Sequence, residues 1–175
     1  HVEAELVAER TAIVPGDAMT VALRLAIIPE WHTYWRNPGD SGEPTQIEWR
    51  LPAGFRAGEI QWPVPERLPA GPLMNYGYSG EVLHLVRIEP PRELALGTSV
   101  TLAARVTWLV CKIDCIPEDA ELSLTLPVAS TASDDPRWSG PIVATRLRIP
   151  AAASALSGWT LGAEPGLEGV ALRLA

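Results

Sequence analysis

The stretch Val-Thr-Leu-Ala-Ala-Arg-Val-Thr-Trp-Leu-Val-Cys-Lys-Ile-Asp-Cys (residues 100–115) decides the fold. Every second residue from 100 to 110 is apolar, which is the period of a β-strand with one buried face. The residues on that face are Val100, Leu102, Ala104, Val106, Trp108 and Val110. The stretch therefore predicts a half-buried strand that ends at a pair of cysteines.

The same alternation recurs earlier in the chain, where Val21, Leu23, Leu25 and Ile27 share one face. Turn sequences such as Pro-Gly, Asn-Pro-Gly-Asp and Pro-Ala-Gly separate further strand candidates. These candidates are residues 2–9, 32–36, 46–51, 59–62, 81–88 and 120–126. Their number and spacing predict an all-β protein, namely an immunoglobulin-like antiparallel β-sandwich.

The composition of the chain changes at Ala129, where Ser-Thr-Ala-Ser-Asp-Asp-Pro-Arg-Trp (130–138) follows. This pattern predicts a linker and a short helix that ends before Pro150, with Ser133 or Asp134 as N-cap and Pro136 in the first turn. Two strand-like pieces, 159–163 and 169–174, flank a Glu-Pro-Gly turn and indicate the start of a second β module. We predict one domain over residues 1–128 and a helical and β extension over 129–175.

Composition and charge exclude some partners. The net charge is −7 without a cluster of Lys or Arg, which argues against nucleic acid and anionic lipid. No apolar run approaches the roughly 18 residues of a membrane-spanning helix, so we expect no direct membrane insertion of this segment. The chain opens at His1 without a methionine or an apolar leader, which indicates an excised or processed segment.

The only cysteines, Cys111 and Cys115, either pair with each other, share a ligand or stay free. A disulfide needs Cα atoms about 4.4–6.8 Å apart, whereas four residues of extended strand span about 13 Å. A disulfide would therefore require a turn between them. Such a short loop adds only about 2 kcal/mol to stability, so a purely structural bridge would contribute little. A redox-active pair and a disulfide that only pins the turn both remain open at this point. Lys112 and Asp114 nearly cancel in charge, so we expect no strongly depressed thiol pKa.

A glycine- and aromatic-rich segment, Gly-Pro-Leu-Met-Asn-Tyr-Gly-Tyr-Ser-Gly-Glu-Val (71–82), precedes the cysteine pair. One interpretation is a tight turn in which Gly77 and Gly80 adopt positive φ. The other is a movable lid over the cysteines. The side chains of that lid would be Leu73, Met74, Asn75 and Tyr76. The residues alone favour neither interpretation.

The segment Gly-Asp-Ser-Gly (39–42) resembles the nucleophile segment of trypsin-like serine proteases. Glu43 stands where those enzymes have a further glycine, and the chain is short for their double barrel. We therefore interpret the segment as a loop.

A soft-metal site is the main alternative to redox chemistry. Cu(I) prefers thiolate, thioether and imidazole ligands. The chain offers these in Cys111, Cys115, Met74, His32 and His84. The spacing of these residues is not diagnostic, and a lone histidine on a strand is more often packed than ligating. We expect no resident metal and no organic cofactor.

Four stretches together resemble the N-terminal periplasmic domain of the DsbD family, especially its ScsB-like branch. They are Trp-His-Thr-Tyr-Trp-Arg-Asn-Pro-Gly-Asp-Ser-Gly (31–42), Trp-Pro-Val-Pro-Glu-Arg-Leu-Pro (62–69), Asn-Tyr-Gly-Tyr-Ser-Gly-Glu-Val (75–82) and Trp-Leu-Val-Cys-Lys-Ile-Asp-Cys-Ile-Pro (108–117). The resemblance covers about residues 2–128.

This resemblance implies an immunoglobulin-like domain of an inner-membrane protein that lies in the periplasm. It implies a thiol:disulfide oxidoreductase that receives electrons from a membrane-embedded redox domain of the same parent protein. The electrons originate with cytoplasmic thioredoxin and pass to periplasmic thioredoxin-like disulfide proteins. A Cu(I)-binding or copper-tolerance module that uses the same cysteines remains the alternative.

The resemblance also assigns site residues. Cys111 and Cys115 match the redox pair, His32 and Tyr34 match positions beside the active site, and we count Trp108 as a further neighbour. The cap loop that shields the pair corresponds to Leu73, Met74, Asn75, Tyr76, Gly77 and Tyr78. The better-known DsbD domains separate their cysteines by five residues and carry a phenylalanine near the position of Asn75. The analogy favours Cys115 as the attacking thiol, and the altered spacing leaves the order of the two cysteines open.

Overall fold

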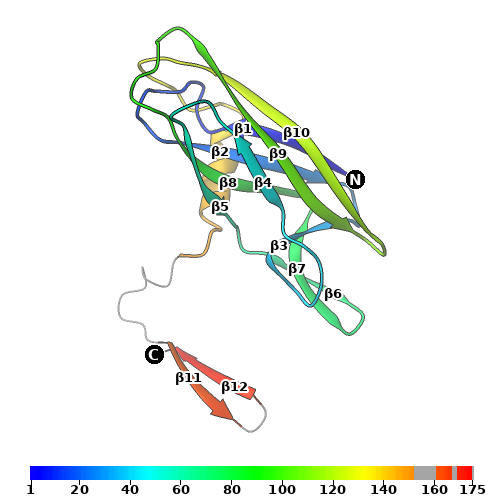
Figure 1. The fold of residues 1–175 in the computed structure, drawn as a ribbon. Coiled ribbons are helices and arrows are strands. Elements are labelled where there is room, and N and C mark those ends of the chain that lie inside the picture. Colours follow the sequence, from blue (N-terminus) through cyan, green and yellow to red (C-terminus); the bar gives the residue numbers. More distant parts are fainter. Residues whose placement is uncertain (152–160, 167–168, 175) are drawn as a thin grey trace.

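The computed structural model describes residues 1–151, 161–166 and 169–174, and its main body is a pair of antiparallel sheets packed face to face (Figure 1). The first sheet has the order β1 (Val2–Ala8), β2 (Met19–Ile27), β8 (Glu81–Glu89) and β5 (Arg56–Gln61). The second has the order β10 (Cys115–Pro127), β9 (Ser99–Cys111), β3 (His32–Gly39), β7 (Leu73–Ser79) and β6 (Glu66–Ala70), and β4 (Gln46–Arg50) also pairs with β9. The predicted immunoglobulin-like sandwich is confirmed.

The predicted face of β9 forms part of the core between the sheets. Leu102, Ala104, Val106 and Val110 are fully buried, and Trp108 is nearly so. They share one apolar cluster with Val21, Leu23 and Leu25 of β2. Removal of this apolar surface from water is the main stabilising contribution to such a core. The period-two pattern therefore predicted the correct inward face on both sheets.

The stretch that includes the predicted cap residues is a β-hairpin, formed by β6 and β7 around a turn at Gly71 and Pro72. The prolines at positions 65 and 69 concealed the first strand in the sequence. β6 is an edge strand, where a missing backbone N–H is tolerated. Residues 73–78 thus lie in β7 of the second sheet, and their assignment to the cap of the cysteine pair stays a prediction.

The predicted positive φ is found at only one of the two glycines of this region. Gly80 does adopt positive φ (68°), in the turn between β7 and β8. Gly77 does not, and lies opposite Tyr34 in the pairing of β7 with β3. A Cβ atom at Gly77 would lie 2.0 Å from the carbonyl oxygen of Thr33. The missing side chain of Gly77 therefore permits close approach of β3 and β7.

The predicted short helix is α1 (Ser139–Arg146), and it begins later than expected. The Oδ1 atom of Asp135 accepts hydrogen bonds from the amides of Arg137 and Trp138, both at 2.9 Å, in the turn before the helix. Asp135 thus takes the capping role predicted for Ser133 or Asp134, because its carboxylate lies over these free amides. Ile142 is fully buried against the outer face of the first sheet.

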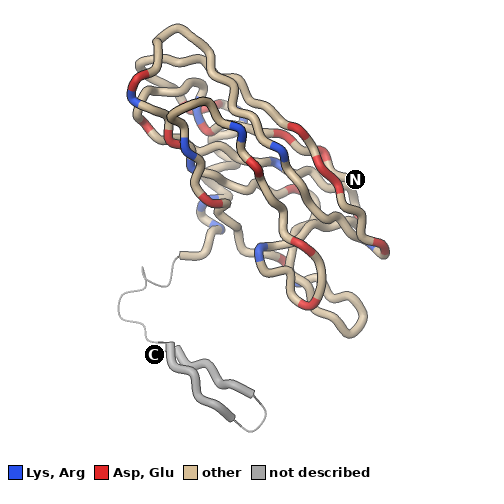
Figure 2. The backbone as a smooth tube through the Cα atoms, in the orientation of Figure 1, with Lys and Arg blue, Asp and Glu red and all other residues tan. Residues whose placement is uncertain are grey.

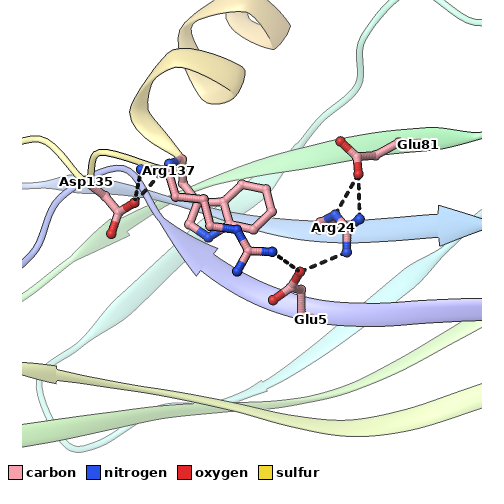
Figure 3. Close-up of polar contacts among 6 residues, drawn as sticks. Glu5, Arg24, Glu81, Asp135 and Arg137 are labelled. Carbon is pink, nitrogen blue, oxygen red and sulfur yellow. Dashed lines mark hydrogen bonds and ion pairs between the residues drawn. The ribbon is translucent and has the colours of Figure 1, made fainter.

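Polar contacts fasten the start of this helical segment to the first sheet (Figure 3). Arg24 donates to Glu5 and Glu81, and so links β1, β2 and β8. Its guanidinium lies 5.7 Å from the centre of the Trp138 ring, and that of Arg137 lies 4.4 Å from it. Residues 137–142 are therefore packed on the sandwich, while the domain boundary at residue 128 stays a prediction.

The last described element is an antiparallel hairpin of β11 (Leu161–Gly166) and β12 (Gly169–Leu174). The predicted Glu-Pro-Gly turn is part of β11, where Pro165 pairs with Val170. Both strands of a two-stranded hairpin are edges, so proline can be accommodated there. Residues 159 and 160 of the predicted strand lie outside the described residues. Within the described part, no helix has the length and apolar character required to cross a membrane.

Candidate functional site

Cys111 and Cys115 form a disulfide at the point where β9 turns into β10. The two residues face each other across the antiparallel pair, and their Cα atoms are 4.2 Å apart. Lys112, Ile113 and Asp114 make the turn, in which the Lys112 amide donates to the Asp114 carbonyl at 3.2 Å. The turn that a disulfide would require is therefore present.

The two sulfur-bearing residues differ in exposure. Cys111 is only 3% exposed, whereas Cys115 is exposed. Ile113, at the tip of the turn, is 90% exposed. Of the two residues, Cys115 is therefore the one that an incoming thiolate is expected to reach first, because Cys111 is buried.

His32 and Tyr34 of β3 lie beside the disulfide. His32 pairs with Cys111 in the register between β3 and β9. The Tyr34 hydroxyl lies 3.8 Å from the Cys115 sulfur, and the His32 Nε2 atom lies 3.3 Å from the same hydroxyl. The two rings meet edge to face with centres 5.2 Å apart. The structure thus joins His32, Tyr34 and Cys115 in one chain of polar contacts.

Burial sets the protonation of these two side chains. It lowers the pKa of His32, because water is removed from the imidazolium form. Burial raises the pKa of Tyr34, because water is removed from the phenolate form. At neutral pH His32 is therefore a neutral imidazole and Tyr34 carries its hydroxyl proton.

The Gly-Asp-Ser-Gly loop packs on Tyr34, a role that the sequence analysis missed. Gly42 has a φ of +99°, and a Cβ atom built on it would lie 2.3–2.5 Å from three atoms of the Tyr34 ring. No side chain fits between the loop and the ring, so glycine is required there. The glycine at each end of the motif was the only sequence signal of this close contact.

The same loop is fastened to the β6–β7 hairpin. The Asp40 carboxylate accepts a hydrogen bond from the Met74 amide at 2.8 Å. The side-chain oxygen of Asn75 accepts two bonds from Ser41, one from its amide at 3.0 Å and one from its hydroxyl at 3.2 Å. Asn75 is only 3% exposed. Asp40 and Ser41 therefore connect the hairpin to the loop that follows β3. Ser41 has a structural contact here, in the segment that resembles a protease nucleophile motif.

The predicted cap residues occupy different environments along β7. Leu73 is 42% exposed near the hairpin turn, whereas Tyr78 is buried and donates its hydroxyl proton to the Pro63 carbonyl at 2.8 Å. The hairpin and the disulfide turn lie at the same end of the sandwich (Figure 1). In the part of the chain that the structure describes, no hydrogen bond joins residues 73–78 to either cysteine. A shielding role for these residues stays a prediction.

Replacing Asn75 by alanine should destabilise the β6–β7 hairpin by about 1–3 kcal/mol, because Ser41 loses its buried acceptor. Hydrogen exchange of the Met74 and Asn75 amides should accelerate accordingly. Asn37→Ala is the matched control, since Asn37 makes one exposed 3.4 Å bond to the Gly39 amide. Equal exchange rates in the two variants would show that Asn75 does not hold the hairpin in place.

Trp108 is not placed among the groups that contact the cysteines. Its side chain lies in the core, and its indole Nε1 donates to the Glu118 carboxylate at 3.1 Å. Trp108 lies on the inward face of β9, three residues before Cys111. Trp108 is close to Cys111 in sequence, but its side-chain hydrogen bond is with Glu118. A role for Trp108 beside the disulfide stays a prediction.

The basic residue next to Cys111, Lys112, forms an ion pair with Glu30. Lys112 donates to the Glu30 carboxylate at 2.7 Å, and this contact lowers the pKa of Glu30. Basic and acidic residues both occur at the tip of the β9–β10 turn (Figure 2), where Lys112 and Asp114 lie. The side chain of Lys112 is thus engaged with a carboxylate outside the turn.

Of the residues considered for a copper site, His32 lies beside the cysteine pair and His84 lies elsewhere. His84 is fully buried on β8, with its ring edge-on to Trp62 and Tyr78. Both cysteine sulfurs are bonded to each other. Across the described ranges, no group of three or more His, Cys, Asp or Glu side chains is arranged to hold a metal ion.

Fold and site together define a β-sandwich domain with a solvent-accessible disulfide at a strand turn. A family model described as "Thiol:disulfide interchange protein DsbD, N-terminal" matches residues 3–127. The chain belongs to this family, and its disulfide-forming pair fits thiol–disulfide exchange.

One solved structure supports the same fold. The N-terminal periplasmic domain of ScsB from Proteus mirabilis is similar with a TM-score of 0.69 at 19% sequence identity. The match covers 99% of this chain and 64% of the other, so this chain spans less than two thirds of that domain. A search among curated proteins gives no match.

Proposed function

We propose that the chain is a periplasmic relay module that carries two electrons from a membrane-embedded redox domain of its parent protein to thioredoxin-like disulfide proteins. The observation that carries this proposal is the Cys111–Cys115 disulfide, with one accessible and one buried residue, in a domain of this family. The periplasmic location named for the ScsB domain supports the proposed compartment.

Loading of the pair begins with attack of a donor thiolate on the Cys115 sulfur. The S–S bond to Cys111 breaks, Cys111 leaves as a thiolate, and a mixed disulfide forms. The second thiolate of the donor then attacks the first donor sulfur in the mixed disulfide, and Cys115 is released as a thiolate. The donor dithiol is oxidised to a disulfide, and the Cys111–Cys115 pair gains two electrons.

Delivery reverses this order with a client disulfide. The Cys115 thiolate attacks one client sulfur, which releases the other as a thiolate. Cys111 then attacks the Cys115 sulfur, restores the internal disulfide and frees the second client thiolate. The reaction needs no further cofactor, because the two sulfurs supply both electrons.

The test is to mix the reduced chain with an oxidised thioredoxin-like protein and count the free thiols of each by alkylation and mass spectrometry. We expect two thiols to disappear from the chain for each client disulfide reduced. The control is Cys111→Ser/Cys115→Ser, which should transfer nothing. A reduced chain that keeps both thiols beside an oxidised client would contradict the relay. Stoichiometric Cu(I) binding by a chain without exchange activity would support the copper alternative.

A further inference from the structure

We infer that the Tyr34 hydroxyl is a catalytic hydrogen-bond donor to the Cys115 sulfur, and that His32 is a positioning residue that directs this hydroxyl. The inference rests on the proposed function in that it identifies how the exchanging sulfur is stabilised. Its basis is the row of contacts from His32 Nε2 to the Tyr34 hydroxyl at 3.3 Å and from that hydroxyl to the Cys115 sulfur at 3.8 Å.

The direction of the donors follows from proton counting. A disulfide sulfur carries no proton, so in the Tyr34–Cys115 contact the hydroxyl must donate. The same hydroxyl has only one proton and must then accept from His32. A neutral imidazole can do this only in the tautomer that carries its proton on Nε2. Burial favours the neutral form by lowering the pKa of His32.

This arrangement becomes stronger when Cys115 is a thiolate. Hydrogen bonds to charged acceptors are roughly twice as strong as those between neutral groups. The Tyr34 hydroxyl therefore stabilises the anionic sulfur that attacks a client, and lowers the pKa of the Cys115 thiol. The proton lost by Cys115 goes to solvent, and Tyr34 and His32 keep theirs.

The surrounding structure holds the Tyr34 ring in place. The side chain is 2% exposed, and Gly42 lies against the ring closely enough that a Cβ atom would overlap it. Asp40 and Ser41 tie the same loop to the β6–β7 hairpin. A buried ring held against this tethered loop presents its hydroxyl to the sulfur at little entropic cost.

Other ionisable groups near the site engage elsewhere. Lys112 bonds to Glu30, and Asp40 accepts from the Met74 amide. Burial is the sole cause of the shifted pKa values of His32 and Tyr34, without a contribution from a charged neighbour. The titratable residues of the adjoining turn, loop and strands, besides His32, Tyr34 and Cys115, are Glu30, Arg36, Asp40, Glu43, Tyr76, Tyr78, Arg105, Cys111, Lys112, Asp114, Glu118, Asp119 and Glu121.

The test uses the 175-residue chain with Cys111→Ser, in which Cys115 is the only thiol. The rate of alkylation by iodoacetamide is measured against pH, and its midpoint reports the Cys115 pKa. Tyr34→Phe should raise the midpoint by about one unit or more, which is about a tenfold loss of thiolate at pH 7. His32→Leu should shift it in the same direction. His32→Gln should restore part of the shift, because its amide N–H can donate to Tyr34. Thr101→Val, which removes an exposed hydroxyl from the half of β9 away from the disulfide turn, should leave the midpoint unchanged.

An unchanged midpoint in a folded Tyr34→Phe protein would overturn the inference. If that variant does not fold, carbon-13 NMR of the Cys111→Ser chain with Tyr34 intact tests the inference instead. The Tyr34 Cζ resonance should then shift with the same midpoint as the Cys115 Cβ resonance, and a constant Cζ shift would overturn the inference. Alkylation needs no partner protein. A raised midpoint without exchange activity would therefore refute the relay alone, and exchange with an unchanged midpoint would refute only the role of Tyr34.

Discussion

Replacing Cys115 by serine should abolish thiol–disulfide exchange, whereas replacing Cys111 by serine should give a protein that accumulates a mixed disulfide. The reason is the difference in exposure, since Cys115 is open to an incoming sulfur and Cys111 is 3% exposed. In Cys111→Ser the attacking thiol remains and the resolving thiol is lost. In Cys115→Ser the remaining thiol lies behind the strand turn and does not reach a partner.

The measurement is incubation of each variant with oxidised glutathione, followed by mass spectrometry of the intact chain and its peptides. Cys111→Ser should carry one glutathione at Cys115, and the double serine variant should carry none. Circular dichroism of both single variants should match the parent, because a five-residue disulfide loop contributes only about 2 kcal/mol. Comparable adduct yields at both positions would show that burial does not order the two cysteines.

Acidification should destabilise the domain through His84 well above the pH at which carboxylates titrate. His84 is fully buried between Trp62 and Tyr78, and neither ring nitrogen has a hydrogen-bond partner in the described part of the chain. Burial lowers its pKa to about 3, because the charged imidazolium would have no water or counter-charge around it. The ring therefore has to lose its native environment before it can accept a proton.

The sign of the effect follows from proton linkage. The ordinary pKa of histidine, about 6.5, applies to the unfolded chain, so below that pH the unfolded state binds a proton that the folded state does not. The free energy of unfolding then falls by about 2 kcal/mol between pH 7 and pH 5. It falls by roughly 4 kcal/mol by pH 3, where the folded pKa is reached.

Urea unfolding at several pH values between 7 and 5 tests this expectation. His84→Leu should remove most of the loss over this interval and keep or raise the stability at pH 7, because leucine leaves no unpaired polar atom in the core. Thr45→Val is the matched control, because it also removes a buried polar atom that has no hydrogen-bond partner among the described residues, but no ionisable group, and should leave the slope unchanged. The same slope in His84→Leu as in the parent would show that another group governs acid sensitivity.

The sequence predicts the sandwich well because its strands carry a plain alternation. The face of β9 and that of β2 are both buried as expected, since only one register places those residues in the core. Strand ends were less predictable. β10 begins at Cys115 because pairing with β9 starts at the disulfide turn, while its polar residues on the solvent face hid the first part of the strand.

The β6–β7 hairpin was missed because local signals and tertiary pairing disagree there. Proline and glycine predict a loop, yet an edge strand accepts proline and Gly77 is needed for contact with Thr33. The resemblance singled out His32 and Tyr34, which lie beside the disulfide, and their role there stays a prediction. The contacts of Gly42 with Tyr34 and of Ser41 with Asn75 join residues far apart in sequence, and no spacing rule predicts them.

The reduction potential of the Cys111–Cys115 pair tests the central claim most directly. The protein is equilibrated in glutathione or dithiothreitol buffers, and its free thiols are trapped and counted by mass spectrometry. A relay requires a value above about −300 mV, in the range where exchange proteins operate, with the folded protein interconverting between both states. A markedly lower potential, or a bond that is reduced only when the chain unfolds, would mean a structural disulfide and contradict the relay.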